Sequence, residues 1–592
     1  MNPEQLIANL VQEAVLKVYG VEPSANLLQT QATRKEFEGD ITAVMFPLLK
    51  ISRKSPEQTG EDIGAFIKGS CEDVENYNVV KGFLNIKLSD RYWLETFKTI
   101  SSADNWGQQP ETGKSVMVEF SSPNTNKPLH LGHIRNNLLG WSVARLLEVN
   151  GHNVIRVNLV NDRGIHICKS MLAWQKLSGK DTPQNTGIKG DHLVGKYYVA
   201  FNDMLKEQVD GLVKSGMDKE EAEKNAPVLK EAQQMLVKWE KGEKEVVELW
   251  KTMNGWVYDG FDKTYKRMGV SFDKIYYESN TYLLGKALVQ EGLGKGVFFT
   301  KDDGSVWCDL SSEGLDEKLL LRADGTSVYM TQDLGTAHQR FSEYKLDEHI
   351  YVVGNEQNYH FQVLRLLLKK LGFEWSDNIY HLSYGMVELP EGKMKSREGT
   401  VVDADDLIDN MVNTARETSL ELGKLDNMPV EEKEHLFEIL GLGALKYFII
   451  KVDPKKTMLF DPKESIDFNG NTGPFIQYTH ARIRSIIRKA TEQGLMGRIT
   501  DSSLDPKERE IIKLLNLFPE KIKEGGKEHS PAVVANYAYE LAKEFNQYYH
   551  EVSILREEDS SIKLQRLVLI DKISAVLRMA MGILGIELPE RM

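Results

Sequence analysis

The stretch that decides the fold class is residues 116–160, VMVEFSSPNTNKPLHLGHIRNNLLGWSVARLLEVNGHNVIRVNLV. It opens with a short β-rich run, Val116–Phe120, and ends with a second apolar run, Val154–Val160, long enough for a buried parallel strand. Between them, residues 131–150 have the pattern of a helix that Gly151 ends. Strand, helix and strand joined by short loops predict a βαβ unit. Its helix is apolar on more than one side, which suits burial against a sheet.

The sequence on either side of this unit predicts three domains. Residues 1–110 combine an amphipathic helix near the start with a strand-like alternation over 82–88, which indicates a small α+β domain that ends in a polar linker. Residues 111–460 are interpreted as a Rossmann-like α/β domain with a parallel sheet and a charged, helix-prone insertion at about 175–260. Residues 461–592 are interpreted as an all-α helical bundle, because apolar residues recur at helical spacing through the last helix.

The composition excludes several classes of protein. The chain has 592 residues, 41% hydrophobic and 27% charged, which excludes a wholly disordered chain, a collagen and a disulfide scaffold. Its three cysteines lie far apart, so we expect no paired-cysteine zinc site. The same spacing favours a protein of the reducing cytoplasm. No run approaches about 18 apolar residues, so no membrane span is expected. The net charge of −13 excludes a polycation that coats nucleic acid but permits a nucleic-acid partner on one basic face.

A pair of histidines lies at the predicted start of the helix, in Pro128-Leu129-His130-Leu131-Gly132-His133. Gly132 leaves room for a flat base to approach the backbone. The helix N-terminus offers free N–H groups and partial positive charge, which favour phosphate. The motif therefore indicates an anion site in which His130 and His133 donate hydrogen bonds to a phosphoryl group. Two structural histidines or a metal pair are the alternatives, although no nearby Cys or His cluster completes a tetrahedral metal site.

A second motif lies far downstream, in Gly392-Lys393-Met394-Lys395-Ser396-Arg397-Glu398-Gly399-Thr400. A glycine-flanked loop with three cations and two hydroxyls can close over polyphosphate as a charge clamp. A solvated basic turn is the alternative interpretation. The clamp interpretation is favoured because the two histidines precede the loop in the same chain, with an α/β pattern between them.

Together the two motifs resemble the class I aminoacyl-tRNA synthetases, with His130, Gly132 and His133 in the first signature and a KMSKS-like loop at 392–400. The wider sequence resembles the arginyl-tRNA synthetase family. The matching segments are Glu119–Asn124, Lys127–His133, Arg322–Thr326, Tyr329–Leu334, Gln357–Phe361, Asn471–Tyr478 and His480–Arg482. The resemblance runs from Phe37–Asp40 to the C-terminal Met592, nearly the whole chain.

This resemblance implies that the chain joins arginine to its tRNA in two steps that consume ATP. The arginine carboxylate attacks the α-phosphorus of ATP, and a terminal ribose hydroxyl of the tRNA then takes the arginyl group. His130 and His133 would donate to phosphate oxygens, Lys395 with Ser396 would bind the departing pyrophosphate, and Gly132 and Lys393 would also contact ATP. Mg²⁺ is expected to arrive with the nucleotide, held mainly by phosphates and water, without a permanent protein metal site.

A planar guanidinium needs carboxylate and carbonyl acceptors in its plane. By family correspondence Asp333 is its charged partner, Tyr329 lines the pocket and Gln357 adds a polar contact. The resemblance places Glu119, Ser122 and Asn124 at the α-amino and carboxylate end of arginine. An aromatic in a strand-to-loop position and a helix cap are the structural alternatives for Tyr329 and Asp333. No editing domain is expected, because a buried ion pair already rejects neutral analogues.

For the tRNA, the C-terminal bundle resembles an anticodon-binding domain. His480, Arg484 and Arg488 fall at i, i+4 and i+8 and predict a cationic stripe, to which Arg482 is added as a further contact. Aromatic residues that could stack on anticodon bases, or simply fill the core, are Tyr537, Tyr539, Tyr548 and Tyr549. The N-terminal domain resembles a module that reads the tRNA elbow, with Phe83 and Asn85 as its contact candidates. By analogy the protein is a monomer.

Other classes of protein fit the sequence less well. A P-loop at Gly107–Ser115 has the wrong spacing and precedes a strand, and Gly292–Gly296 is followed by a strand-like segment rather than a helix. A small-molecule nucleotidylyltransferase would not explain the long helical C-terminus. A non-catalytic tRNA-binding relative would be expected to lose a histidine or the loop lysine. Another amino-acid specificity within class I is the closest rival, and only the resemblance over residues 322–333 argues against it. The loop also departs from the fullest KMSKS pattern, since Gly392 takes the first lysine position and Lys393 is displaced by one.

Overall fold

The computed structural model describes residues 2–388, 402–421 and 428–592. Its centre is a five-stranded sheet in the order β12-β11-β5-β6-β7, and every neighbouring pair in it is parallel. The βαβ unit predicted from the sequence is confirmed, because α5 connects β5 to β6 and packs on both. The sheet elements and this helix are β5 (Ser115–Glu119), α5 (Leu131–Val149), β6 (Asn153–Val160), β7 (Lys274–Tyr277), β11 (Glu348–Gly354) and β12 (Ile379–Tyr384). The predicted fold class, a Rossmann-like α/β domain with helical and α+β parts, is confirmed.

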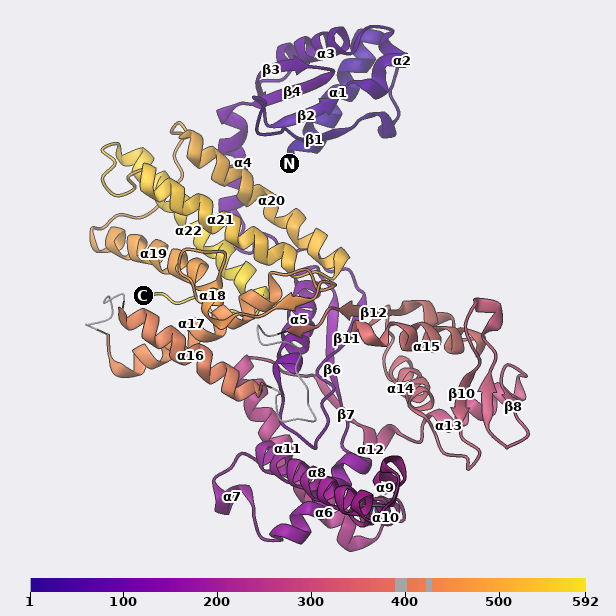
Figure 1. Ribbon diagram of the computed structural model, residues 1–592. Helices are drawn as coiled ribbons and strands as arrows, with labels where there is room; N and C mark the ends of the chain where they lie inside the picture. Colours follow the sequence, from indigo (N-terminus) through magenta and orange to yellow (C-terminus); the bar gives the residue numbers. More distant parts are fainter. Residues whose placement is uncertain (1, 389–401, 422–427) are drawn as a thin grey trace.

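Two groups of elements interrupt the parallel sheet. The first, between β6 and β7, is helical and forms the lower arm of the molecule in Figure 1. It consists of α6 (Ile165–Leu177), α7 (Pro183–Thr186), α8 (Gly190–Lys214), α9 (Lys219–Asn225), α10 (Pro227–Glu240) and α11 (Lys244–Met268). The second, between β7 and β11, includes a separate antiparallel sheet ordered β10-β9-β8, to which the strand-like run at 297–299 leads. It consists of α12 (Glu278–Thr281), α13 (Gly285–Gly294), β8 (Phe299–Thr300), β9 (Val306–Cys308), β10 (Lys318–Leu321) and α14 (Tyr329–Glu343), and α15 (Asn358–Lys370) follows β11.

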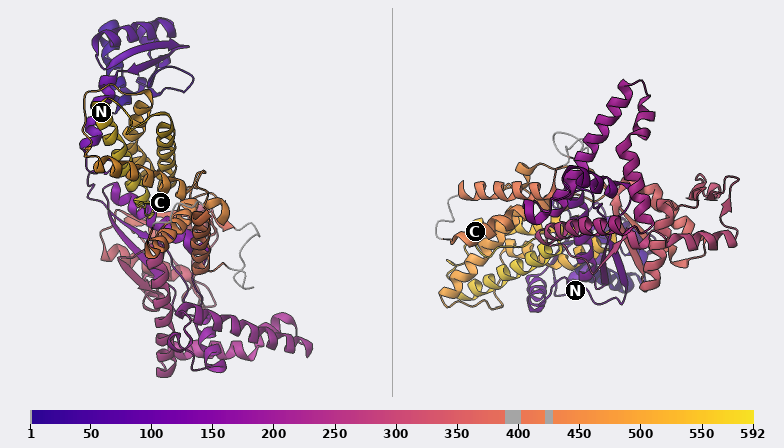
Figure 2. Two further views of the ribbon diagram at one scale, coloured as in Figure 1. Left: turned by 90° about the vertical axis from the view of Figure 1, so that its left-hand side faces the viewer. Right: turned by 90° about the horizontal axis from the view of Figure 1, so that it is seen from below.

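The N-terminal residues form an antiparallel sheet ordered β1-β2-β4-β3 that is covered by α1 and α3. Its elements are α1 (Pro3–Tyr19), β1 (Thr30–Ala32), β2 (Ile41–Val44), α2 (Leu49–Ser52), α3 (Pro56–Ser70), β3 (Val74–Val80), β4 (Phe83–Leu88) and α4 (Asp90–Ser102). Figure 2 shows the molecule as elongated, with this part at one end and the helical arm at the other. Arg509 of the C-terminal helices forms an ion pair with Asp90, which ties the N-terminal part to them.

The last third of the chain is mostly helical. Its elements are β13 (Val387–Glu388), α16 (Ala404–Glu421), α17 (Val430–Ile450), β14 (Met458–Leu459), α18 (Pro462–Ser465), α19 (Gly473–Glu492), α20 (Pro506–Glu528), α21 (Ala532–Glu551) and α22 (Ser560–Ile583). Within the described ranges, each helix is too short or too polar to cross a membrane.

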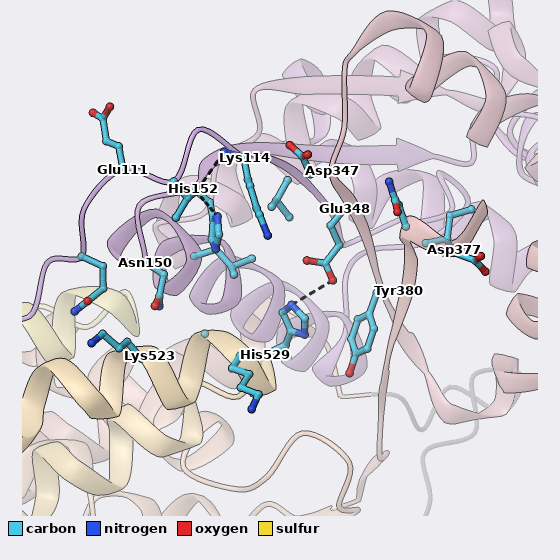
Figure 3. Close-up of a pocket in the computed structure, with 18 of the residues that line it drawn as sticks. Glu111, Lys114, Asn150, His152, Asp347, Glu348, Asp377, Tyr380, Lys523 and His529 are labelled. Atoms are coloured by element: carbon cyan, nitrogen blue, oxygen red, sulfur yellow. Dashed lines mark hydrogen bonds and ion pairs between the residues drawn. The ribbon is translucent and has the colours of Figure 1, made fainter. Parts of the chain in front are cut away.

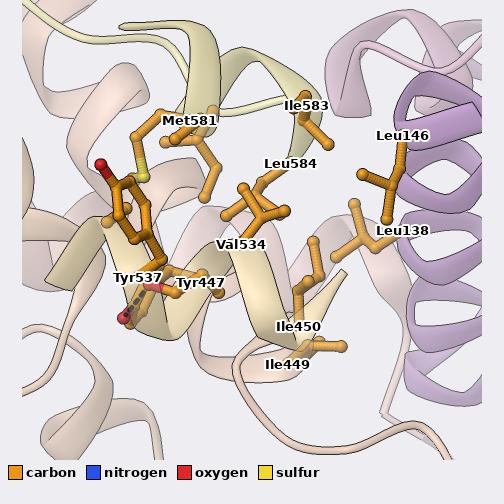
Figure 4. Close-up of a cluster of buried hydrophobic side chains, with 14 of the residues drawn as sticks. Leu138, Leu146, Tyr447, Ile449, Ile450, Val534, Tyr537, Met581, Ile583 and Leu584 are labelled. Carbon is orange, nitrogen blue, oxygen red and sulfur yellow. Dashed lines mark hydrogen bonds between the residues drawn. The ribbon is translucent and has the colours of Figure 1, made fainter. Parts of the chain in front are cut away.

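The bundle and the parallel-sheet domain share one apolar core. Leu138 and Leu146 of α5 face Ile450 of α17, Val534 of α21 and Leu584 just after α22, and all five are buried (Figure 4). At the end of α5 the Asn150 side-chain amide donates to the carbonyl of Ile522, 2.9 Å away, in α20. The helix that begins with the histidine motif is therefore held between the sheet and the bundle.

Candidate functional site

His130 and His133 meet at the N-terminus of α5, just beyond the carboxyl end of β5. Nδ1 of His130 accepts a hydrogen bond from the Gly132 backbone N–H at 3.1 Å, and Nδ1 of His133 accepts from the His130 N–H at 3.2 Å. The two ring centroids are 3.9 Å apart. Because each Nδ1 is an acceptor, the proton of each neutral ring lies on Nε2, which is then the donor. This corrects one expectation, since these two backbone N–H groups are used by the imidazoles and are not free for phosphate.

Burial sets the charge of the two imidazoles. It lowers the pKa of His130 to about 4, with the nearby Lys127 ammonium adding to the effect, and burial likewise lowers the pKa of His133 well below its usual value. At neutral pH both rings are uncharged donors. Each ring can therefore donate a hydrogen bond from Nε2–H to a phosphoryl oxygen without carrying a charge itself.

These lowered pKa values predict a loss of stability in mild acid. The unfolded chain takes up a proton on a histidine near pH 6.5, whereas folded His130 does so only near pH 4, so acid favours the unfolded state between these values. His130 alone is expected to account for about 2 kcal/mol of the unfolding free energy lost between pH 7 and pH 5. Denaturant unfolding of the wild type and of His130→Asn, whose side chain can still cap α5, would measure this. Equal pH dependence of the two proteins would contradict it.

The segment that follows the second motif returns to the histidines. Leu131 N–H donates to the Val402 carbonyl at 3.1 Å, Ala404 N–H donates to the Leu129 carbonyl at 3.0 Å, and His130 and Asp403 form an antiparallel bridge. Lys393, Lys395 and Ser396 themselves lie outside the described residues. On the other side of that loop, β13 pairs with β14 in parallel.

A cavity of about 430 Å³ opens beside His130. One wall comes from the loop before α5, where Lys127 and Asn124 lie, and the other comes from α6 and α8 of the helical arm. The residues lining it are Asn124, Asn126, Lys127, Pro128, Leu129, His130, His166, His192, Gly195, Lys196, Tyr198, Val199 and Asp403. Asn124, predicted at the amino-acid end, therefore lies on the wall that carries His130.

A larger cavity, about 910 Å³, lies at the opposite edge of the sheet, where the strands begin. Figure 3 shows Lys114 and Glu348 of the α/β domain facing Lys523 and His529 of the helical bundle across it. Nε2 of His529 is 3.5 Å from a carboxylate oxygen of Glu348. Since this cavity is far from the carboxyl ends of the parallel strands, where ligands of such sheets bind, we place the site at the smaller cavity.

Glu119 ends β5 and is buried in an ion pair with Arg340 of α14. Ser122 Oγ donates to Glu119 at 3.4 Å, and the Ser122 N–H donates to Asn158 Oδ1 at 3.0 Å. Ser121 and Ser122 both have positive φ, 79° and 45°, which L side chains seldom adopt. Such backbone strain persists only where surrounding hydrogen bonds maintain it, and it is common in functional turns.

Asp333 and Tyr329 lie one turn apart on α14. The Asp333 carboxylate is 2.6 Å from Nε2 of His360, and Tyr329 is 78% exposed at the start of the helix. Gln357 is exposed one turn before His360, at the start of α15. The charge of Asp333 helps to raise the pKa of both the Glu119 and Glu278 carboxyls, after the larger effect of burial, so the three carboxyls share one region. Such an acidic neighbourhood suits a cationic ligand.

Comparison with known proteins supports, along the whole chain, the family resemblance seen in the sequence. Residues 97–461 match the model of the class I tRNA synthetase (R) catalytic domain, and residues 476–592 match the DALR anticodon binding domain. An arginine–tRNA ligase of Bacteroides thetaiotaomicron is 58% identical, with 100% of this chain and 99% of the relative covered. The chain belongs to the arginyl-tRNA synthetase family. A counterpart from Porphyromonas gingivalis is 55% identical over 99% of both chains. The solved Thermus thermophilus arginyl-tRNA synthetase has a TM-score of 0.78 at 26% identity, covering 100% of both chains.

The cationic stripe expected in an arginyl-tRNA synthetase bundle is only partly confirmed in position. His480 is buried, with Nδ1 3.1 Å from the Pro589 carbonyl, so it belongs to the core; helical spacing alone could not show that the C-terminal segment covers it. Arg484 forms ion pairs with Glu590 and Asp571, and Arg488 donates to the Glu590 carbonyl at 2.8 Å. Arg482 lies over the rings of Tyr478 and Tyr549, at 4.8 and 5.0 Å from their centroids.

The bundle aromatics and the N-terminal candidates differ in exposure. Tyr537 and Tyr548 are buried, which agrees with the core alternative, whereas Tyr549 is 39% exposed and Tyr539 is half-buried. Phe83 is at the surface. Asn85 is buried, accepts from Thr42 Oγ1 at 2.6 Å and donates to Asn78 at 2.8 Å, so it would have to leave these bonds to contact RNA.

Sequence reasoning missed the partners that hold the site residues. Arg340 pairs with Glu119 and His360 pairs with Asp333, yet neither carries a sequence signal beyond its place within or near the matched segments. Lys127 lies three residues before His130, and this position beside two histidines could have marked it as part of the cavity wall that carries His130.

One group of potential metal ligands occurs among the described residues, Asp191, His192 and Asp405. The Lys189 ammonium lies 3.0 Å from Asp191, 2.6 Å from Asp405 and 2.6 Å from Thr264 Oγ1. Because this ammonium already occupies the position of a cation between the two carboxylates, the group is explained as an ion-pair cluster without a metal.

Proposed function

We propose that the chain is an arginine–tRNA ligase that activates arginine with ATP and transfers it to the terminal ribose of the arginine-accepting tRNA. Relatives that bear the name arginine–tRNA ligase match it over its full length at 55–58% identity. The structural observation that best supports the chemistry is the pairing of residues 402–404 with residues 129–131. It brings the residues that follow the second motif against the histidines, which supports a shared site for one triphosphate.

In the activation step, the chain's own groups position phosphate and stabilise charge, which is what in-line phosphoryl transfer mainly requires. His130 and His133 donate from Nε2 to phosphate oxygens, and Gly132 leaves space for the nucleotide. Lys395 and Ser396 bind the departing pyrophosphate, with Lys393 as a further ATP contact. Mg²⁺ accompanies ATP and supplies charge neutralisation on its phosphates.

The arginine pocket is assigned to the acidic region. Asp333 receives the guanidinium, Tyr329 covers it and Gln357 contributes a polar contact. Glu119, Ser122 and Asn124 serve the α-amino and carboxylate end. The ion pair that Arg340 forms with Glu119 opposes the effect of burial on that carboxyl and fixes its position.

The remaining parts serve the tRNA. We assign residues 1–110 to a tRNA-binding domain, 111–460 to catalysis and 461–592 to anticodon recognition, with Phe83, Asn85, Arg482, Arg484 and Arg488 as contacts. Arg484 and Arg488 would exchange their present carboxylate and carbonyl partners for phosphates. The enzyme is proposed to act as a cytoplasmic monomer, and its unpaired Cys71, Cys168 and Cys308 are consistent with a reducing compartment.

ATP–pyrophosphate exchange with each amino acid, with and without total tRNA, tests this function. Exchange is expected with arginine alone and to depend largely on tRNA. Exchange with a different amino acid, or none with arginine when tRNA is present, would refute the assignment.

A further inference from the structure

The cavity beside His130 has a second wall that the roles above leave unused. It comes from α8 of the helical arm, which carries His192 and Lys196 on the face that lines the cavity. Gly195 lies between them, and a Cβ there would be 2.8 Å from Cδ of Pro128. The glycine therefore lets α8 approach the loop before α5 closely enough for the two walls to share one ligand.

His192 is held in position by a partly buried charge network. Its Nε2 lies 3.1 Å from the Asp405 carboxylate and 3.5 Å from that of Asp403. Asp405 also accepts from Lys189 at 2.6 Å and, through its other oxygen, from Thr264 Oγ1 at 2.9 Å. Lys189 and Thr264 thus fix the Asp405 carboxylate and balance most of its charge, and the fixed carboxylate in turn orients the His192 ring. The Asp405 hydrogen bond raises the pKa of His192.

The charges that face the cavity favour an anion. The Lys127 ammonium and the uncharged donor His130 stand on one wall, and Lys196 and His192 stand on the other. Asp403 is the carboxylate among the lining residues, and its Oδ1 accepts from the N–H groups of Asp405 and Asp406 at 2.8 and 3.3 Å, which caps α16. Lys196 is 57% exposed and 3.7 Å from Asp181, a weak pairing that it can exchange for a phosphate.

We propose that His192 and Lys196 form a phosphate-binding wall opposite His130, so that a phosphate group in this cavity is held from both the α/β domain and the helical arm. The inference rests on the proposed function, which supplies two sources of phosphate: the pyrophosphate end of ATP and the terminal phosphodiesters of the tRNA. A volume of about 430 Å³ accommodates either. The charge-assisted bonds involved are the kind that recognise phosphate strongly.

The test uses the full chain and three variants, His192→Gln, Lys196→Met and the control Lys206→Met, which removes an exposed ammonium farther along α8. Calorimetric titration with magnesium pyrophosphate and the KM values for ATP, arginine and tRNA are measured for each. A five- to tenfold weaker pyrophosphate affinity with a matching rise in ATP KM, at unchanged arginine KM, assigns the wall to ATP. The same change in tRNA KM alone assigns it to tRNA.

Changes within twofold for both ligands, or equal changes in Lys206→Met, would overturn the phosphate wall. Thermal unfolding of each variant checks that the α8 packing survives. The two proposals fail separately: a wild-type chain that exchanges pyrophosphate with arginine while the variants behave normally refutes only this inference. A wild-type chain without exchange refutes the proposed function, and the titration still tests the cavity.

Discussion

Asp333→Ala is expected to raise the KM for arginine about 100-fold while the KM for ATP stays within about twofold. The carboxylate lies on the exposed face of α14, is oriented by His360 Nε2 at 2.6 Å, and is the proposed partner of the guanidinium. Removing it leaves a charged ligand group without its acceptor, a loss of about 3 kcal/mol. Steady-state exchange kinetics with varied arginine and varied ATP would measure both constants.

Asp333→Asn separates charge from shape in this experiment, since the amide keeps the size but loses the ion pair. It should resemble the alanine variant more than the wild type. Asp377→Asn is the matched control, because this carboxylate lies on the surface near the large cavity at the opposite edge of the sheet. An equal rise in both KM values for Asp333→Ala would remove Asp333 from the arginine pocket.

His133→Asn is expected to lower kcat of arginine activation by about 100-fold, which corresponds to about 3 kcal/mol of transition-state stabilisation. An asparagine oxygen can still accept the hydrogen bond that His130 N–H now gives to His133 Nδ1, so the start of α5 should keep its structure. What the variant lacks is the donor at Nε2. Single-turnover formation of the adenylate would report the chemical step directly.

His133→Gln provides the complementary variant, because its amide nitrogen reaches the position of Nε2. Partial recovery of kcat in this variant would support donation to phosphate. If His133→Asn retained more than a tenth of the wild-type rate, the imidazole would be a capping residue of α5 and nothing more.

The central unit of the fold was predictable because its signals are local. Apolar runs at 116–120 and 154–160 became β5 (Ser115–Glu119) and β6 (Asn153–Val160), and the helix between them ends one residue before Asn150. Alternation, helical periodicity and a terminating Gly151 act over a few residues, so a sequence shows them without knowledge of tertiary contacts.

Tertiary contacts explain what the sequence could not show. His480 has the helical spacing of a surface stripe, yet the segment around Pro589 folds back over it. Tyr548 is buried between helices of the bundle, where its hydroxyl donates to Glu508 of α20 at 3.0 Å. Glu119 was expected at a ligand, and only the fold shows that Arg340 is already beside it.

The position of α5 limits how such an enzyme can be remodelled. Its first turn orients the two imidazoles, and its middle packs through Leu138 and Leu146 against the bundle (Figure 4). Replacing the bundle with a different RNA-binding domain would expose the apolar face of the helix that orients the two proposed catalytic imidazoles. A successful chimera would have to reproduce that cover as well as the new specificity.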